Sequence, residues 1–413
     1  MCLASFCSAQ LRAEFVKNVP RTVNLITAEQ QSFVQQEIDS TDYKDDTGWE
    51  KLDKDSSVFV KLSKKHSRGG SNAWGKATTT IDTSAENALA WFWDYCSNER
   101  LDAVNKLHKN PREVIKHIAS NHNVLSSIKS LPWPLRSRQF VSENTWTKQD
   151  DNMYVYAWRP PITHEFDDNH LVNIGNHKVN KLVRAESKGF CTLTNVGNQN
   201  CELTWVQHLN LNGNIPAKLM DKQIPRSLGA VFQVRETFNR DDEIDREERN
   251  EIMGVMKNDE NEVYSEEESA FVRRVTLRMD NIAEGIITEL KTPDFRVPMS
   301  LSHVDGEPHA FFKCKVLIDA TIEECCAYNF QFNSRKRMRI NDRKDVLLRE
   351  EKSVNNHNKE FLMFRAFPLG ISPRSFMSRQ IWQLSATGER IDHNIETIKK
   401  SDLLTAERKN LAR

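Results

Sequence analysis

Three histidines form the densest group of side chains that could do chemistry. His164, His170 and His177 lie in one polar stretch, with Glu165 and Asp167 between the first two. Their spacings do not enforce the convergent geometry of a metal site, so we expect a solvated loop, with a pH-sensitive gate as the alternative. The cysteines form no C-x-x-C pair, and no phosphate-binding glycine loop, G-x-S-x-G elbow or H-E-x-x-H motif occurs. The sequence therefore predicts no catalytic residue, no metal site and no cofactor.

The composition indicates a globular chain whose charges cancel. It has 413 residues, with 58 Lys and Arg against 58 Asp and Glu, and it contains 9 Trp and 20 Phe. This length predicts two or three domains, and the neutral balance gives no field that would attract nucleic acid. No stretch approaches the ~20 apolar residues of a spanning helix. Because the cysteines show no disulfide pattern, we expect reduced thiols in a soluble, cytoplasmic protein.

Hydrophobic periodicity predicts a mixed α+β domain in the first 240 residues. Apolar residues at helical spacing indicate helices over 27–39 and 85–98, a helical continuation to 130, and a long last helix that ends near 239. A curved antiparallel sheet closed by that long C-terminal helix would enclose a cavity that side chains alone do not fill. The strands predicted by period-two alternation are 58–62, 77–81, 140–147, 153–158, 177–185, 191–195 and 203–211.

An internal similarity predicts a second, incomplete copy of this domain. A strand that runs into Ile81-Asp82 and then an acidic helix has a counterpart at Ile318-Asp319. Because later landmarks keep one offset of about 236 residues, chance is a poor explanation. These landmarks are Arg138 with Arg374, Phe140 with Phe376, and Trp146 with Trp382. The predicted division is an N-terminal extension at 1–24, a complete domain at 25–240, an acidic linker at 241–264 and a partial copy at 265–413.

Two charged runs are interpreted as solvent-exposed. Residues 241–268 are strongly acidic, which favours a solvated linker over a binding tail. The basic run 335–344 is expected to be a solvated face, with attraction to anionic lipid or nuclear targeting as alternatives.

Four motifs occur in this region: Gly48-Trp49-Glu50, Arg138-Gln-Phe140, Val183-Arg-Ala-Glu186, and the run 203–220 with its Gly213-x-Ile215-Pro turn. Together they resemble the motifs of the START domain, a lipid-binding member of the helix-grip (Bet v 1-like) fold. The resemblance covers about 27–239 and implies a hydrophobic tunnel that holds one lipid. It also implies that the C-terminal helix and a loop gate the tunnel; here that loop is 160–178, with Leu171, Val172 and Ile174.

The resemblance leaves the ligand class open and argues against a sterol. Sterol-binding members pair an arginine with a buried acid, and this sequence has Asn144 and Leu125 at those positions. We therefore expect a phospholipid, a sphingolipid or a free acyl chain, exchanged by transient contact with a membrane surface. Arg184 and Glu186 share one strand face and could contact a polar head group, with a surface pair as the equal alternative. The other expected contacts, with strand parity open, are Trp205, Ile215, Leu219, Leu228, Val231 and Phe232.

Two further functions are compatible with the sequence. The domain could be a lipid-sensing module or scaffold that controls a partner. The cavity could also be an enzyme pocket, because related helix-grip folds include hydrolases and cyclases. Lipid binding with intracellular transfer, without catalysis, is the function that the sequence predicts. On this prediction, Leu228→Glu in the closing helix abolishes lipid uptake and leaves the sheet folded.

Overall fold

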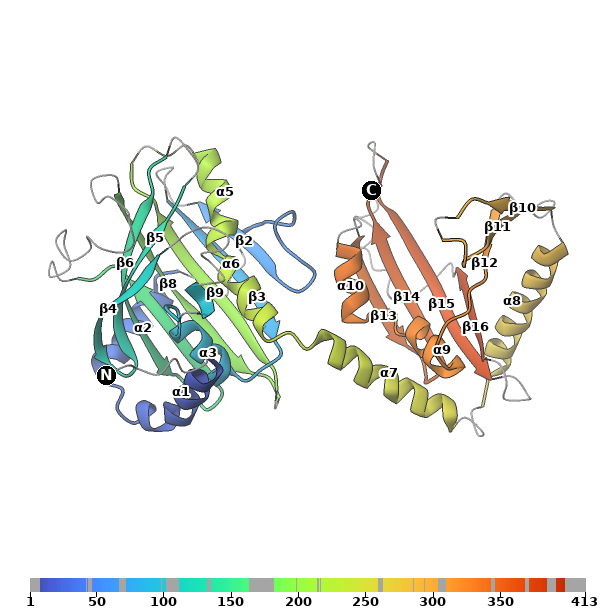
Figure 1. Cartoon of the computed structure of the whole chain (residues 1–413), viewed down its shortest axis with the longest axis horizontal. Helices are drawn as coiled ribbons and strands as arrows, with labels where there is room; N and C mark the ends of the chain where they lie inside the picture. The colour runs from blue at the N-terminus through green and yellow to red at the C-terminus, as the bar shows by residue number, and fades with distance from the viewer. Residues whose placement is uncertain are drawn as a thin grey trace. The chain divides into compact units, whose positions relative to one another are not determined.

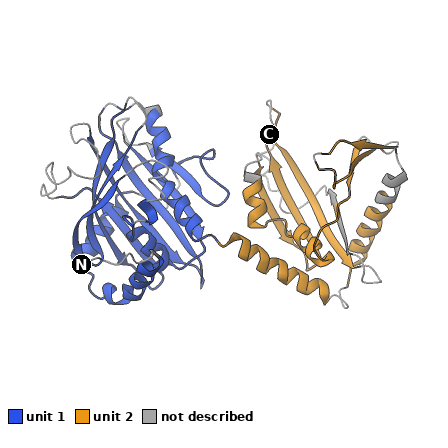
Figure 2. Cartoon of the chain, viewed as in Figure 1, with its two compact units in different colours: residues 1–239 blue, residues 240–413 orange. Residues whose placement is uncertain are grey.

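The computed structural model divides the chain into two compact units, residues 1–239 and 240–413 (Figure 2). The structure describes residues 8–397, apart from 42, 44–46, 67–71, 98, 102–110, 132–134, 163–181, 198, 214, 216, 259–262, 285, 293, 304–309, 343–345, 368–370 and 385–390.

The first unit is built on one curved, nine-stranded sheet (Figure 1). Its order is β1-β2-β3-β9-β8-β7-β6-β5-β4, and neighbours in this order are antiparallel. With its covering helices this is the α+β helix-grip fold that the sequence predicts. The strands are β1 (Glu50–Lys51), β2 (Lys61–His66), β3 (Asn72–Ile81), β4 (Arg112–Ala119), β5 (His122–Lys129), β6 (Arg138–Lys148), β7 (Met153–Arg159), β8 (Val183–Asn195) and β9 (Cys201–Asn210).

Helices cover both faces of this sheet. On one face, α2 (Ala28–Asp39) packs Phe33 and Val34 against Val206 of β9. On the other face, Phe92 packs against Trp205, the neighbour of Val206, with ring centroids 5.2 Å apart. Alternate residues of one strand therefore face two separate layers. The helices of the second layer are α1 (Ser8–Val23), α3 (Ala85–Trp93), α5 (Ala217–Ser227) and α6 (Gly229–Thr237).

The start of α2 shows how local sequence fixes an element. The Thr27 hydroxyl accepts a hydrogen bond from the backbone N–H of Gln30, and the Gln30 side chain accepts one from the backbone N–H of Thr27. This capping box satisfies two N–H groups at the helix terminus. The helix that the sequence predicts over 27–39 is confirmed.

Helices α5 and α6 together, called the lid below, pack closely on β3. Gly75 permits this contact, because an added Cβ would lie 3.0 Å from the Ile224 side chain and 3.1 Å from that of Leu228. Ile224, Leu228 and Val231 are buried in the core of the unit. Each such side chain contributes about 1.5–3 kcal/mol when fully buried, so apolar contacts hold the lid.

The sequence prediction of a helical continuation to 130 is wrong. Residues 112–129 instead form the antiparallel hairpin β4–β5. The Asn121 side chain at its turn donates hydrogen bonds to the Trp146 carbonyl and to Gln30 Oε1, both at 3.0 Å. These partners lie far away in sequence, so local periodicity does not report them.

Two other elements differ from their predicted form. Parts of the predicted strands 177–185 and 191–195 belong to the single strand β8, which passes through Gly189. Gly189 has φ of 154°, and a Cβ there would lie 2.1 Å from the Val206 carbonyl oxygen. The predicted long closing helix is two helices, because α5 ends at Ser227 and Leu228 is the N-cap of α6.

In the second unit, the acidic segment expected to be a linker forms a helix instead. Helix α7 (Asp241–Lys257) buries Met256 in a core with residues of α9 (Ile322–Phe330). Asp245 is 1% exposed and accepts hydrogen bonds from the backbone N–H groups of Arg335 (2.7 Å) and Lys336 (3.0 Å). These residues begin α10 (Arg335–Asp342), the basic run. The two charged runs are therefore partners within one unit, because acidic oxygens satisfy the N-terminus of a helix.

The remaining elements of the second unit form two antiparallel sheets and one more helix. The sheets have the orders β10-β11-β12 and β13-β14-β15-β16. The elements are α8 (Glu266–Glu284), β10 (Ile286–Leu290), β11 (Met299–His303), β12 (Ala310–Cys314), β13 (Val346–Ser353), β14 (Asn358–Arg365), β15 (Arg374–Leu384) and β16 (Ile391–Thr397).

Two paired strands of the second unit match two of the first in length, spacing and register. Strands β14 and β15 have the same lengths as β5 and β6 and begin 236 residues after them. The strand pairing is also kept: His122 pairs with Thr145, and Asn358 pairs with Ile381. A backbone hydrogen bond of 3.1 Å recurs as well, from Trp146 to Asn121 in the first unit and from Trp382 to His357 in the second.

Candidate functional site

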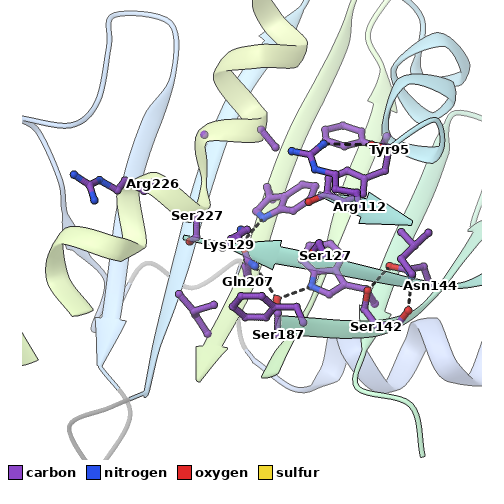
Figure 3. A pocket seen from close by; sticks show the side chains of 18 of the residues that line it. Tyr95, Arg112, Ser127, Lys129, Ser142, Asn144, Ser187, Gln207, Arg226 and Ser227 are labelled. Atoms are coloured by element: carbon purple, nitrogen blue, oxygen red, sulfur yellow. Dashed lines mark hydrogen bonds between the residues drawn. The ribbon is translucent and has the colours of Figure 1, made fainter. Parts of the chain in front are cut away.

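A cavity of about 660 Å³ lies between the inner face of the first unit's sheet, α3 and the lid (Figure 3). Alternate residues of β5 to β9 line it, and on β9 these are Trp205, Gln207 and Leu209. The lid contributes Gln223 and Ala230. Cavities of about 300–1,000 Å³ are typical of ligand pockets in proteins, so this one is large enough for a guest molecule.

A hydrogen-bonded group of side chains fixes the aromatic wall of the cavity. Ser187 Oγ accepts hydrogen bonds from Trp158 Nε1 (3.0 Å) and Gln207 Nε2 (2.7 Å), and Trp205 Nε1 donates to Gln207 Oε1 (3.3 Å). The two indole rings lie with centroids 4.4 Å apart. Because their N–H groups are satisfied within the protein, the rings can present apolar faces to the cavity.

A second polar group occupies β6 and β7. Asn144 Oδ1 accepts hydrogen bonds from the Tyr156 hydroxyl (3.0 Å) and from Ser142 Oγ (3.3 Å). Burial raises the pKa of Tyr156, so the phenol is neutral at physiological pH. Asn144 and Leu125, at the positions compared with the sterol-binding pair, both line the cavity. At these two positions the chain therefore has an amide, whose oxygen already accepts hydrogen bonds, and a leucine, in place of the charged pair described for sterol-binding members.

Cationic side chains form another part of the lining. The Arg112 guanidinium lies 3.9 Å from the ring centroid of Tyr95, and Arg100 lies 5.0 Å from it. Burial lowers the pKa of Arg100 to about 10, and the nearby charge of Arg112 acts in the same direction. Burial also lowers the pKa of Lys129. For Tyr95, burial alone would raise the pKa, but Arg112, Lys129 and Arg100 together outweigh it and lower the value.

Arg138 joins the end of the sheet to the segment that leads into the lid. It is 4% exposed, and its Nε donates to the Leu211 carbonyl (2.6 Å). Its other two guanidinium nitrogens donate to the carbonyls of Arg136 (2.6 Å) and Asn212 (3.3 Å). The arginine of the Arg-x-Phe motif thus satisfies main-chain carbonyls, which is a structural role.

The residues expected to contact a ligand lie in different places. Trp205 lines the cavity, whereas Leu228 and Val231 are in the core between lid and sheet, with Phe232 packed against that core. Ile215 belongs to a smaller apolar cluster that includes the cavity residues Phe140, Leu209 and Leu211, and Leu219 packs against it.

Arg184 and Glu186 do not line the cavity. Their neighbour Ser187 pairs with Leu209 and faces inward, so Arg184 and Glu186 point to the opposite face of β8. Glu186 is exposed and accepts a hydrogen bond from Asn210 (3.4 Å). The gate residues Leu171, Val172 and Ile174, like the three histidines, lie outside the described residues.

Sequence reasoning missed the cationic part of the lining. Arg100 follows α3, whereas Arg112 and Lys129 come from the hairpin that was predicted to be helical. Leu125, Ser127 and Lys129 alternate along the sequence and all line the cavity. This period of two was the sequence signal that could have predicted a strand with Lys129 facing inward.

In the described ranges, no group of three or more His, Cys, Asp and Glu residues could hold a metal ion. Among the helices described, none has the length and apolar character needed to cross a bilayer.

Comparison with known proteins gives one family match. The family model "START domain" matches residues 107–240, from just before β4 to the end of the lid. No curated protein sequence matches the chain.

Similar solved structures include human StAR-related lipid transfer protein 5, at 16% identity over 51% of this chain and 95% of that chain, with a TM-score of 0.40. The lipid transfer and protein localization domain of human StarD13 (DLC2) is similar at 16% identity, 52% and 98% coverage, and a TM-score of 0.37. A fragment of a STAR-related lipid transfer protein from Xanthomonas axonopodis gives 17% identity, 47% and 99% coverage, and a TM-score of 0.37.

Proposed function

We propose that the first unit binds one membrane lipid in its cavity and carries it between membranes without catalysis. The observation that carries this proposal is a cavity of about 660 Å³, most of whose lining falls within the residues that match the START-domain family model. Aromatic rings and aliphatic side chains such as Phe92, Phe140 and Leu209 offer an apolar surface to acyl chains. Polar side chains in the lining offer hydrogen-bond partners to a head group.

The lid would set the rate of exchange. Each buried methylene contributes about 0.8 kcal/mol, and it contributes a similar amount in a bilayer. A lipid therefore has little net preference for either site, and the frequency of lid opening governs transfer. The loop 160–178 with Leu171, Val172 and Ile174 stays a proposed second part of the gate.

The residues around the cavity favour a carrier over an enzyme. The described lining contains no Asp, Glu, His or Cys side chain, so its serine hydroxyl groups have no carboxylate or imidazole base among the described lining residues. A phospholipid, a sphingolipid or an acyl chain is proposed before a sterol, because Asn144 and Leu125 provide no ion pair for a hydroxyl group.

Lipid extraction from the purified full chain tests this function. We expect mass spectrometry to find a co-purifying lipid, and labelled lipid to move between vesicles faster when the protein is added. Tight binding without faster transfer would instead indicate the sensing or scaffold function. A chain that retains no lipid, and takes up none from vesicles, would overturn the proposal.

Filling the cavity from the lid gives a sharper test. Leu228→Glu is unsuitable, because Leu228 is 0% exposed and a carboxylate there would disrupt the core. Ala230 lines the cavity, so Ala230→Trp should occupy the space of the ligand. We expect lipid binding to weaken at least about tenfold, equivalent to ~1.4 kcal/mol. The control is Thr237→Trp, because Thr237 is exposed on the same helix and does not line the cavity. Equal lipid binding by both variants would place the ligand elsewhere.

We also propose that residues 265–413 are a partial second copy of the domain at 25–240. The common order of elements, the repeated lengths of β14 and β15 and their kept register support this division. A common ancestor explains these shared spacings more simply than independent origins do.

A further inference from the structure

Four cationic side chains line the cavity; Arg226, on the lid, is exposed, and the other three have no acidic partner in the described part of the chain. Arg100, Arg112 and Lys129 come from three different elements, and none of them forms an ion pair with a described carboxylate. Asp94 influences Arg100 only at longer range. The three side chains rest on aromatic rings: Arg100 lies 3.6 Å from the Trp91 ring centroid, and Lys129 lies 5.5 Å from that of Phe140.

The backbone contacts of the two arginines leave charge uncompensated. Arg100 donates to the Trp91 carbonyl (2.7 Å), and Arg112 donates to the Tyr95 carbonyl (3.2 Å). Carbonyl groups orient guanidinium groups but carry no net negative charge. Arg100 is only 5% exposed, so water compensates little of its charge. Buried cations without an anion are unfavourable, and their mutual repulsion adds to that cost.

We propose that this cluster selects a lipid whose head group is a phosphate monoester or a carboxylate. The inference rests on the proposed lipid-binding function and names the ligand class for the same cavity. An anionic head group would accept charge-assisted hydrogen bonds from the cluster, and a guanidinium can bind phosphate or carboxylate through two parallel bonds. The acyl chain would then lie along the wall formed by Phe92, Trp158 and Trp205.

Other head groups fit this lining less well. Choline and ethanolamine would bring a further cation next to three existing ones, and the described lining offers no carboxylate to hold it. A sterol hydroxyl carries no charge and would leave the cluster uncompensated.

Uptake from neutral vesicles tests the selection. The full chain is incubated with phosphatidylcholine vesicles that contain a small, equal fraction of labelled phosphatidic acid, oleate, phosphatidylethanolamine or cholesterol, and the re-isolated protein is assayed for label. We expect phosphatidic acid or oleate to be retained at least about tenfold more than the other two. Comparison of phosphatidic acid with oleate distinguishes a phosphate-bearing from a carboxylate-bearing ligand. Preferential retention of either lipid supports the proposal.

Two single variants connect that preference to the cluster. Arg112→Gln and Lys129→Gln should each reduce the ratio of anionic to neutral lipid retained about tenfold or more. The control Lys116→Gln removes the same charge from an exposed position of β4 outside the cavity, so it accounts for attraction to the vesicle surface. Circular dichroism verifies the fold, and either variant alone suffices if the other does not fold.

The outcomes separate this inference from the broader function. If the protein retains all four lipids equally and neither variant changes retention, the cluster does not select the head group and the inference is overturned. If it retains none of them, lipid binding itself fails.

Discussion

Arg138 illustrates how a motif residue acquires its role from tertiary structure. The sequence identifies it only as the arginine of an Arg-x-Phe pair. In the fold, its guanidinium group donates to three main-chain carbonyls, two of which belong to Leu211 and Asn212 ahead of the lid. Burial lowers its pKa below the usual range for arginine, yet the side chain stays charged at physiological pH.

Removal of this guanidinium should loosen the lid. Arg138→Met keeps much of the side-chain bulk but leaves buried carbonyls unsatisfied. We therefore expect the free energy of unfolding of the first unit to fall by about 3 kcal/mol. Amide hydrogen exchange should also accelerate over 217–237. Arg136→Met is the matched control, because Arg136 is exposed and contributes only its carbonyl. Unchanged exchange in the lid would contradict this role.

At the scale of elements, buried acidic groups anchor helices in the second unit. Glu268, in the first turn of α8, accepts hydrogen bonds from the side chains of Asn355 (2.8 Å) and Asn358 (2.7 Å) and from the backbone N–H of Ser265 (2.9 Å). Burial alone would raise the pKa of Glu268, but these hydrogen bonds outweigh it and lower the pKa to about 2. The carboxylate therefore connects α8 to the β13–β14 turn while it is ionised.

This anchor predicts an acid sensitivity of the second unit. The folded pKa of about 2 lies below the ordinary value of 4.5, so Glu268 stabilises the fold above pH 4.5 and loses this contribution as pH falls toward 2. Glu268→Gln should be less stable than the wild type at pH 7, and the difference should shrink at pH 3. Thermal unfolding at both values measures this, with the exposed Glu266→Gln as control. A stability difference between the wild type and Glu268→Gln that is the same at pH 7 and pH 3 would contradict this role of Glu268.

At the scale of the whole molecule, each of the two units has its own core, and each core buries a tryptophan. Trp146 and Trp382 are 1% and 0% exposed, and each belongs to the core of its own unit. They differ in one respect: Trp382 Nε1 donates to the Asn356 carbonyl (3.2 Å), whereas Trp146 Nε1 is buried and has no partner among the residues that the structure describes. The hydrogen bonding of the two indole N–H groups therefore differs between the two units.

Separate cores predict that core mutations act locally. Trp146→Phe and Trp382→Phe should each destabilise its own unit by about 1–3 kcal/mol and leave the other nearly unchanged. We expect the larger effect for Trp382→Phe, because that change also removes a hydrogen bond. Amide hydrogen exchange, read separately over 8–239 and 240–397, measures both effects. A single mutation that accelerates exchange equally in both ranges would argue against two units.

Much of the fold was accessible from the sequence, and much of the site was not. The helix α2, the helix around Phe92 and the alternation of β9 depend on local signals, and each was predicted correctly. The hairpin β4–β5 was not, because its Asn121 turn depends on Gln30 and Trp146. The helix in the acidic segment was also not predicted, since its partner, the N-terminus of α10, lies about ninety residues away.

The sequence by itself determined the helix-grip class, the spacing of the repeated landmarks and the apolar face of the lid, since these depend on residues close together in the chain. Only the tertiary structure decided which residues line the cavity. It turned Arg184 and Glu186 away from the cavity and gathered Arg100, Arg112 and Lys129 beside it. Strand pairing and the inward face of each strand set these positions, and both are fixed by contacts between segments distant in sequence.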